Sequence, residues 1–454
     1  MDFKQLEYFI FEKMSALNTA GVSMALIEGD EVVWSRGFGF RNVGERLPAT
    51  PGTVYDIASV TKSFTAAAVL QLEEQGMLSL EDPVDKFIPE FHIKPFGETI
   101  KIKHLLTHSS GIPGLGSSTR MKGSILGTRD DLMPIVEFED YLTFMRDAQE
   151  WTVARPGERF LYSNEGYALL GYLVQLCAGI PFTEYVKNNI LEPLGMTRSY
   201  FNKVEVETDP DVATLHAINT EGHRVPMPYP FGRVNSHSGL ISNADDLMRF
   251  VSMCINRGEY EGERVLSAQS VEAMLTPRIP TGSSREMSYG YGFDLIPDFF
   301  GHKLAGHGGW IDISAAYVGF VPEKRLGAAV LMNGAGYLPD FIAMYGLAML
   351  LGENPDSLPF IVRDRMLEEL TGTYKTYMDT IGAQVKRMGG FLMLELRYED
   401  HRRMTVPLIP DTLTENHRLF YTMFLTVRSD VEFTIKNGRI ELNYQRWLFR
   451  KDKS

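Results

Sequence analysis

Residues 59–75 read SVTKSFTAAAVLQLEEQ and predict a helix, because Ala and Leu dominate the stretch and Gly76 follows directly after it. Ser59 and Lys62 stand three residues apart at the start of this helix, so their side chains share one face. A buried lysine near a helix N-terminus loses affinity for its proton and can accept one from a neighbouring hydroxyl. The pair is therefore a candidate nucleophile and its base.

A Ser-x-x-Lys motif alone is weak evidence, since about one is expected by chance in a chain of this length. The ordinary alternative is a capping serine followed by an exposed lysine. Two downstream motifs strengthen the catalytic interpretation: Tyr162-Ser163-Asn164 and His307-Gly308-Gly309, the second just before a strand expected at 312–321.

The side chains of these motifs suit a hydrolase cleft. Tyr162 can relay a proton, Asn164 can hold Lys62 and a substrate carbonyl, and His307 can recognise charge at the cleft edge. Taken singly, each also has a structural explanation: a packing tyrosine, an asparagine that caps the helix at 165–178, and a histidine in a turn. Their order along the chain favours the joint interpretation.

Longer stretches around these motifs carry a family resemblance: LLTHSSGIPG (105–114), RPGERFLYSNEGYALLG (155–171) and SGLISNADDLMRF (238–250). Over about residues 5–350 the chain resembles class C β-lactamases, D-aminopeptidases, DD-peptidases and related esterases. The resemblance implies a helical lobe beside an antiparallel sheet, with the active site between them. It also implies an oxyanion hole formed by the backbone N–H groups of Ser59 and Trp310, and substrate contacts from Asn164, His307 and Gly309.

The third motif departs from the Lys-Thr-Gly that β-lactamases and DD-peptidases usually carry. His-Gly-Gly lacks the hydroxyl and the permanent charge that hold a β-lactam or a C-terminal carboxylate, so we expect weak β-lactamase activity at most. A histidine at this place resembles D-aminopeptidases and CubicO-type peptidases. We therefore expect a serine peptidase acting on peptides, with D-residues favoured; short acyl esters are the alternative substrates.

The rest of the chain predicts an α+β catalytic domain over residues 1–352. A helix is expected at 3–18, a β-hairpin at 22–28 and 31–39, and a mainly helical middle. Strands at 312–321 and 326–333 and a helix at 339–351 complete the expected domain, with early and late strands in one antiparallel sheet. We expect the segment 115–154 to form the rim of the cleft.

A second domain is predicted after the polar, turn-rich stretch 352–358. Residues 353–370 are expected to form a linker and a short helix, and closely spaced strands over 371–454 predict a small antiparallel barrel or sandwich. Lys436-Asn437-Gly438 predicts a hairpin turn. The barrel resembles the lipocalin-like domain of some CubicO proteins, which implies a homo-oligomer and a closed, self-compartmentalising assembly. A packed barrel used for assembly is favoured over one that binds an apolar ligand.

The composition of the chain disfavours several classes of binding partner. A net charge of −13 disfavours binding to nucleic acid and to anionic membranes, and no apolar run reaches about 18 residues. The N-terminus lacks the pattern of a secretion signal, so we expect a cytoplasmic protein. The two cysteines, Cys177 and Cys254, have neither disulfide-framework nor zinc spacing, and we expect no cofactor.

Three other functions were weighed. His104 and His108 have the i, i+4 spacing of a helical zinc pair, but the glutamate that follows the first histidine in such motifs is missing. An α/β-hydrolase would need a Gly-x-Ser-x-Gly elbow, which the sequence does not contain. A non-catalytic penicillin-binding scaffold stays possible, although it need not retain Ser59, Lys62, Tyr162 and Asn164 together.

Overall fold

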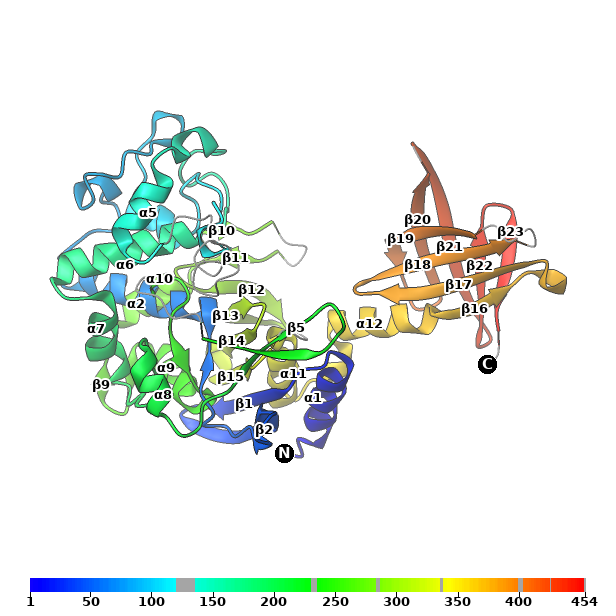
Figure 1. Cartoon of the computed structure of the whole chain (residues 1–454), viewed down its shortest axis with the longest axis horizontal. Coiled ribbons are helices and arrows are strands. Elements are labelled where there is room, and N and C mark those ends of the chain that lie inside the picture. The colour runs from blue at the N-terminus through cyan, green and yellow to red at the C-terminus, as the bar shows by residue number, and fades with distance from the viewer. Residues whose placement is uncertain are drawn as a thin grey trace. The chain divides into compact units, whose positions relative to one another are not determined.

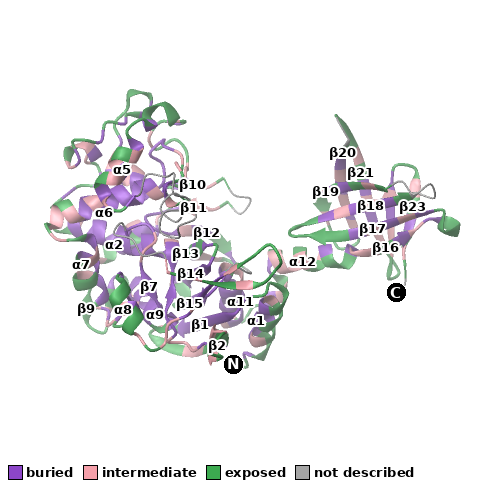
Figure 2. Cartoon of the chain, viewed as in Figure 1, coloured by how far each residue is buried: buried purple, intermediate pink, exposed green. Residues whose placement is uncertain are grey.

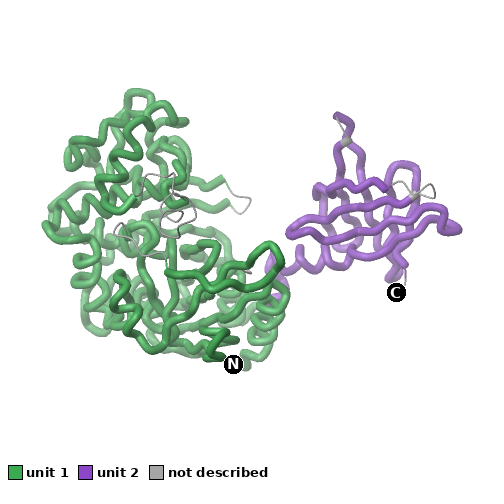
Figure 3. The backbone as a smooth tube through the Cα atoms, viewed as in Figure 1, with its two compact units in different colours: residues 1–353 green, residues 354–454 purple. Residues whose placement is uncertain are grey.

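The chain forms two compact units, Met1–Glu353 and Asn354–Ser454 (Figures 1 and 3). The structure, a computed structural model, describes residues 1–119, 135–229, 235–282, 286–334, 338–398, 403–424 and 426–452.

An antiparallel sheet forms the centre of the first unit. Its nine described strands lie in the order β10 (Ile279–Pro280), β11 (Ser288–Tyr289), β12 (Asp294–Phe299), β13 (His302–Ile311), β14 (Ser314–Val321), β15 (Leu326–Met332), β1 (Gly21–Glu28), β2 (Glu31–Asn42) and β3 (Leu47–Pro48). The early and late strands meet where β1 pairs with β15, in the register Val22 to Met332 through Glu28 to Leu326. The prediction that they share one sheet is confirmed.

Helices cover both faces of this sheet, which explains why β14 and β15 are buried along their whole lengths (Figure 2). On one face, α11 (Pro339–Leu350) brings Gly346 against Met24 and Leu26 of β1, and α1 (Lys4–Ala16) packs on α11. On the other face, Val251 of α9 (Ala244–Ile255) lies against Gly327 beside Ile27. Alternate residues of β1 therefore serve two cores.

The helical lobe is built around α2 (Thr61–Glu74), in which every residue from Thr61 to Leu72 is buried. The helices α6 (Asn164–Ala178), α7 (Phe182–Val186) and α10 (Ala268–Met274) pack on it, and α3 (Ile102–Leu106) and α5 (Phe138–Met145) pack on α6; a further short helix is α8 (Lys203–Thr208). Short strand pairs are β4 (Tyr55–Asp56) with β7 (Ile241–Ser242), β5 (Leu215–Ile218) with β6 (Arg224–Met227), and β8 (Glu259–Tyr260) with β9 (Glu263–Arg264). Single turns of 3-10 helix are η1 (Ala58–Val60), η2 (Val84–Lys86), η3 (Pro95–Gly97), η4 (Ala148–Trp151) and η6 (Pro322–Lys324), and η5 (Lys187–Leu191) is a π-helical turn.

Among the described residues, no single helix combines the length and the apolar composition needed to cross a membrane. One bent pair, Asn164–Ala178 with Phe182–Leu191 at 78°, meets both requirements only when its two helices are counted together.

The second unit is a closed antiparallel barrel preceded by η7 (Pro355–Ser357) and the helix α12 (Pro359–Leu370). Its strands are β16 (Gly372–Lys375), β17 (Ile381–Met388), β18 (Phe391–Tyr398), β19 (Arg403–Leu413), β20 (His417–Phe424), β21 (Val427–Lys436), β22 (Arg439–Tyr444) and β23 (Trp447–Lys451), with η8 (Tyr377–Asp379) between β16 and β17. Strand β16 pairs with both β17 and β23 and so closes the barrel. Inward side chains such as Leu394, Phe420 and Phe433 are fully buried, so the barrel has a packed core. The predicted α+β domain followed by a small barrel is confirmed.

Two local features differ from the expectation. The strand expected at 312–321 is β14, and it follows His307-Gly308-Gly309 as predicted, but the motif itself lies inside β13, a strand that was not predicted. Ser59, expected to open the helix at 59–75, belongs to the 3-10 turn η1, and the regular helix α2 begins at Thr61.

Candidate active site

Ser59 is held in a tight turn that leads into α2. The Asp56 carboxylate accepts the Ala58 N–H at 2.7 Å, and the Thr61 hydroxyl donates to the Ala58 carbonyl at 2.7 Å. Ala58 itself has a φ of 46°, a backbone conformation that is costly for any residue with a Cβ atom. The surrounding hydrogen bonds fix this strained residue directly before Ser59, whose side chain stays partly exposed.

Lys62 is completely buried, and its ammonium nitrogen reaches three oxygens. Nζ lies 3.0 Å from Ser59 Oγ, 2.8 Å from Asn164 Oδ1 and 2.7 Å from the His237 carbonyl. Each of these partners is a neutral oxygen. Burial therefore lowers the pKa of Lys62 well below its usual value, and the nearby Glu165 carboxylate offsets the shift only in part. The geometry favours an unprotonated amine beside the serine.

Tyr162 lies over the same lysine, with Lys62 Nζ 4.8 Å from the centre of its ring. Burial raises the pKa of Tyr162 far above its usual value, although its hydrogen bond with Ser59 acts in the opposite direction. The side chain is thus a neutral phenol at ordinary pH. The environment therefore favours the phenol over the phenolate.

Asn164 is the first residue of α6, but it does not cap the helix. The cap is Ser163, whose hydroxyl accepts the Gly166 N–H at 3.1 Å. Asn164 Oδ1 accepts from Lys62, and its Nδ2 donates to Ser118 Oγ at 2.7 Å. Ser118 belongs to the predicted rim segment 115–154, of which residues 120–134 lie outside the described part of the chain.

His307 is buried in β13, and both of its ring nitrogens are engaged. Nδ1 lies 2.7 Å from the Gly308 carbonyl and Nε2 lies 3.0 Å from the Tyr289 hydroxyl. Burial and the neighbouring Lys62 lower the pKa of His307 to about 3. The sequence suggested that His307 recognises charge at the cleft edge, and that role stays a prediction. The lowered pKa disfavours it, and the ring lines the cleft beside the Tyr289 hydroxyl.

The rest of the His-Gly-Gly strand approaches the nucleophile closely. A Cβ atom on Gly309 would lie 2.0 Å from the Ile57 carbonyl oxygen and 3.0 Å from the Ser59 nitrogen, so only glycine fits there. Trp310 follows, with 61% of its surface exposed. Its backbone position beside the Ser59 turn is compatible with the expected oxyanion hole, which stays a prediction.

A cavity of about 390 Å³ joins these residues. It is lined by Ser59, Tyr162, Met287, Asp294, Ile296, His307, Gly308, Gly309, Trp310, Ala316, Tyr317, Leu338, Pro339, Asp340 and Met344. The lining combines Ser59, two aspartates and several apolar side chains. Asp294 stands out because burial and the nearby Asp340 raise its pKa to about 7.

Comparison with known proteins decides the family. Residues 7–353 match the Beta-lactamase family, and residues 355–450 match the Pab87 octamerisation domain. The chain belongs to the Beta-lactamase family. It is a homologue of the penicillin-binding serine hydrolases, as the resemblance in the sequence predicted.

One solved structure is similar over the whole length: the octameric penicillin-binding protein homologue from Pyrococcus abyssi, with 43% identity and a TM-score of 0.93, covering 99% of this chain and 100% of that one. A putative penicillin-binding protein from Bacillus subtilis is 31% identical over 63% of this chain and 64% of its own length. Protein flp from Staphylococcus aureus is 28% identical over 75% of this chain and 65% of its own length. The match thus spans slightly less than two thirds of these two curated relatives.

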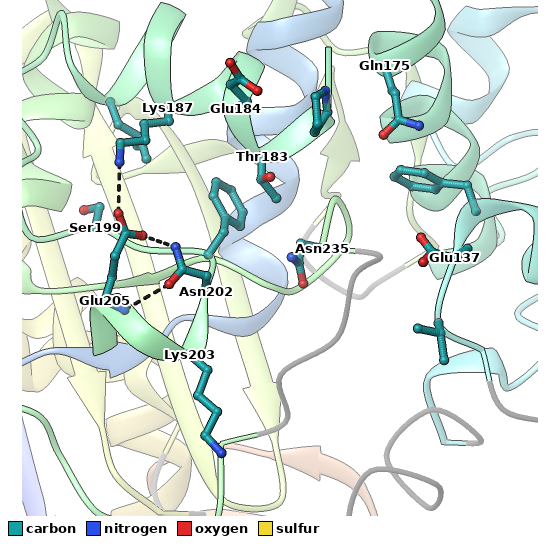
Figure 4. Close-up of a pocket in the computed structure, with 15 residues that line it drawn as sticks. Glu137, Gln175, Thr183, Glu184, Lys187, Ser199, Asn202, Lys203, Glu205 and Asn235 are labelled. Atoms are coloured by element: carbon teal, nitrogen blue, oxygen red, sulfur yellow. Dashed lines mark hydrogen bonds and ion pairs between the residues drawn. The ribbon is translucent and has the colours of Figure 1, made fainter. Parts of the chain in front are cut away.

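A larger hollow of about 730 Å³ lies elsewhere in this Beta-lactamase family unit and contains none of the predicted site residues (Figure 4). Its polar side chains satisfy one another: Lys187 Nζ lies 2.9 Å from Glu205 Oε1, and Asn202 also bonds Glu205. Size alone therefore does not identify the active site of this family member, and the smaller cavity at Ser59 holds the candidate nucleophile.

Sequence reasoning missed two residues that complete the site. His237 supplies the carbonyl that binds Lys62, and its ring lies 2.7 Å from both the Tyr141 hydroxyl and Ser238 Oγ. The quoted family stretch begins one residue later, at 238, and could have directed attention to it. The other is His108, which was considered only as a zinc ligand.

The zinc pair finds no support in the geometry. His104 Nδ1 accepts the Lys101 N–H at 3.1 Å, and His108 Nδ1 accepts the Ser163 N–H at 3.0 Å. The two rings thus accept hydrogen bonds from different segments. Within the described residues, no three His, Cys, Asp or Glu side chains are grouped as metal ligands.

Proposed function

We propose that the chain hydrolyses acyl substrates through a covalent intermediate on Ser59. The observation that carries the proposal is the 3.0 Å contact between Lys62 Nζ and Ser59 Oγ, made by a buried lysine whose other partners are neutral oxygens. Its lowered pKa makes this amine less firmly protonated than an exposed lysine, and the unprotonated amine can take the serine proton.

In this mechanism Ser59 Oγ attacks the substrate carbonyl while its proton passes to Lys62 Nζ. The backbone N–H groups of Ser59 and Trp310 hold the oxyanion. The Tyr162 phenol, hydrogen-bonded to Ser59, relays a proton to the leaving group as the carbonyl–leaving-group bond breaks. Water then attacks the acyl carbonyl and gives a proton to Lys62 Nζ. As the bond between the acyl group and Ser59 Oγ breaks, that proton returns to Ser59 Oγ and the free acid leaves.

For the substrate we favour peptides, with D-residues preferred, and short acyl esters as the second choice. The neutral His307 supports substrates without a carboxylate at this strand, because it offers no permanent positive charge. Asp294 and Asp340 in the same cavity act in the same direction, since neither offers a positive charge to a substrate carboxylate. Turnover of a chromogenic cephalosporin is therefore expected to be slow.

The nucleophile is tested with Ser59→Ala. We expect this variant to lose hydrolysis and covalent labelling by a fluorophosphonate while it stays folded. The matched control is Ser63→Ala, one turn further along α2, where the hydroxyl donates to the Gly292 carbonyl at 2.7 Å. Labelling of Ser59→Ala at the wild-type rate would refute the assignment.

The substrate class is tested by parallel assays of D- and L-aminoacyl anilides, p-nitrophenyl esters and a chromogenic cephalosporin. Peptidase function predicts cleavage of an anilide, with the D-form faster. Ester turnover without amide cleavage would show an esterase and not a peptidase. Rapid labelling without turnover of any substrate would favour the non-catalytic scaffold.

We also propose that the chain assembles as a homo-octamer through residues 354–454, in a closed arrangement around its active sites. Support comes from the match of 355–450 to an octamerisation domain and from the octameric relative with 43% identity. Light scattering should give a mass eight times that of the 51.2 kDa chain. A monomeric mass would remove this proposal without affecting Ser59.

A further inference from the structure

His108 occupies a strained and buried position beside the candidate nucleophile. It follows α3, has a φ of 54° and exposes 1% of its surface. A left-handed backbone is uncommon for a residue other than glycine, although histidine and asparagine adopt it more readily than most. Such strain persists where surrounding contacts require that residue.

Those contacts bracket Tyr162 on both sides. The carbonyl of His108 accepts the Leu161 N–H at 2.6 Å, and its ring atom Nδ1 accepts the Ser163 N–H at 3.0 Å. One residue thus fixes the backbone immediately before and immediately after the tyrosine.

The imidazole ring also lies against the tyrosine side chain. Its centre is 4.2 Å from that of Tyr162, 4.8 Å from Tyr167 and 4.9 Å from Tyr289. Because Nδ1 accepts a hydrogen bond, the proton of the neutral ring lies on Nε2, which is buried and has no hydrogen-bond partner within the described residues. Burial and the neighbouring Lys62 lower the pKa of His108 well below its usual value, so Nδ1 remains an acceptor.

We propose that His108 is a positioning residue for the reaction, and that its Nδ1 and carbonyl together set the place of Tyr162 relative to Ser59. This inference rests on the proposed function of Ser59 and Tyr162. His108 touches neither substrate nor the reacting oxygen; it acts through the hydrogen bonds to Leu161 and Ser163. A displacement of Tyr162 by a fraction of an ångström weakens proton relay much more than it weakens substrate binding.

Two substitutions distinguish the role of the Nδ1 hydrogen-bond acceptor from the role of the aromatic ring. His108→Phe keeps an aromatic ring but leaves the Ser163 N–H without an acceptor; we expect kcat to fall by about 30- to 100-fold with KM within about twofold. His108→Asn loses the ring but places Oδ1 near the position of Nδ1 and tolerates the left-handed backbone, so kcat should stay within about fivefold of wild type. His92→Phe, at an exposed site, is the control.

The role through Tyr162 is tested by combining His108→Phe with Tyr162→Phe. If His108 acts on the tyrosine, its substitution should cost less than about threefold in the Tyr162→Phe background. The proposal would be overturned if His108→Phe lowered kcat as much in the Tyr162→Phe background as in the wild type. It would also be overturned by a wild-type kcat in His108→Phe, or by equal losses of kcat in His108→Phe and His108→Asn. If His108→Phe does not fold, the test rests on His108→Asn, and a loss of kcat beyond about tenfold in that variant counts against the positioning role.

The same experiments distinguish failure of this inference from failure of the proposed function. Should Ser59→Ala still be labelled, the nucleophile is wrong whatever the His108 variants do. Should Ser59→Ala be inert while His108→Phe matches wild type, only the positioning role is lost.

Discussion

The two units of the chain place their charged side chains in opposite environments. In the catalytic unit, Lys62 is fully buried and bonded to neutral oxygens, so its pKa falls well below the usual value. In the barrel, Lys386 lies at the surface, with Nζ 2.9 Å from Glu395 Oε2. One lysine is desolvated beside the candidate nucleophile, and the other pairs with a carboxylate at the surface.

The carboxyl groups of the two units differ in the same way as the two lysines. Burial and the nearby Asp340 raise the pKa of Asp294 in the cleft to about 7. On the barrel, hydrogen bonds from Lys386 and Arg397 lower the pKa of Glu395 to about 2. Titratable groups whose pKa is shifted by burial concentrate at functional sites, whereas exposed ion pairs keep both partners ionised over most of the pH range. The comparison therefore locates the chemistry in the first unit.

The largest effect is expected at Lys62. Lys62→Ala removes the proposed base and should lower turnover about a thousandfold, measured as kcat on the best anilide or ester. In the wild type, kcat/KM should fall as the pH drops through the lowered pKa of Lys62, because only the unprotonated amine accepts a proton. Lys386→Ala, the matched surface lysine, should keep wild-type kinetics. A Lys62→Ala enzyme with near-normal kcat would contradict the role.

Much of this site was predictable because the decisive residues stand in continuous, strongly patterned segments. The Ala-rich run after Ser59 fixes the helix that presents Lys62, and the helix predicted at 165–178 is α6, which begins one residue earlier. Roles assigned to Ser59, Lys62 and Tyr162 remain predictions, but the fold brings the three side chains into contact.

The missed features depend on contacts between distant segments. His237 acts through a backbone carbonyl, which carries no side-chain signal, and His108 acts across 55 residues. Strands β10 and β11 contain two residues each, too few for an alternating pattern. Burial of His307 in strand β13 lowers its pKa and keeps the imidazole neutral. This burial was not predicted, because the two glycines of the motif indicated a turn and not a strand.

The second effect tests a buried cation in the barrel unit itself. Arg418 exposes 3% of its side chain and donates to the Met366 carbonyl at 2.6 Å and to Glu369, both on α12. Arg418→Ala leaves these acceptors unpaired and should reduce barrel stability by about 2 kcal/mol, measured by calorimetric unfolding of the full chain. Arg439→Ala, on an exposed turn, is the control. Equal stability of the two variants would show that burial adds nothing to this contact.

A smaller, pH-dependent effect is expected at Asp294. Its folded-state pKa of about 7 lies well above the usual value of an aspartate, so the folded state binds the extra proton. That stabilisation is complete below about pH 4 and is lost as the pH rises through 7. Asp294→Asn cannot ionise and so avoids this loss of stability at high pH. The difference in Tm between this variant and the wild type should therefore be about 2–4 °C larger at pH 8.5 than at pH 5, in favour of the variant. Asp298→Asn, exposed on the same strand, should show no such pH dependence.

The smallest effect is expected for the barrel carboxylate of the comparison. The Glu395 side chain is 13% exposed, but its partners Lys386, at 2.9 Å, and Arg397, at 2.8 Å, are 52% and 49% exposed. Solvent therefore screens both pairs, and fixing three long side chains costs conformational entropy. Glu395→Gln should therefore leave Tm within about 1 °C of wild type at pH 7. It should also leave kcat unchanged, because the barrel carries none of the proposed reacting groups. A loss of several degrees would mean that this pair is buried in the assembled protein, and that the contrast between the two units belongs to the isolated chain alone.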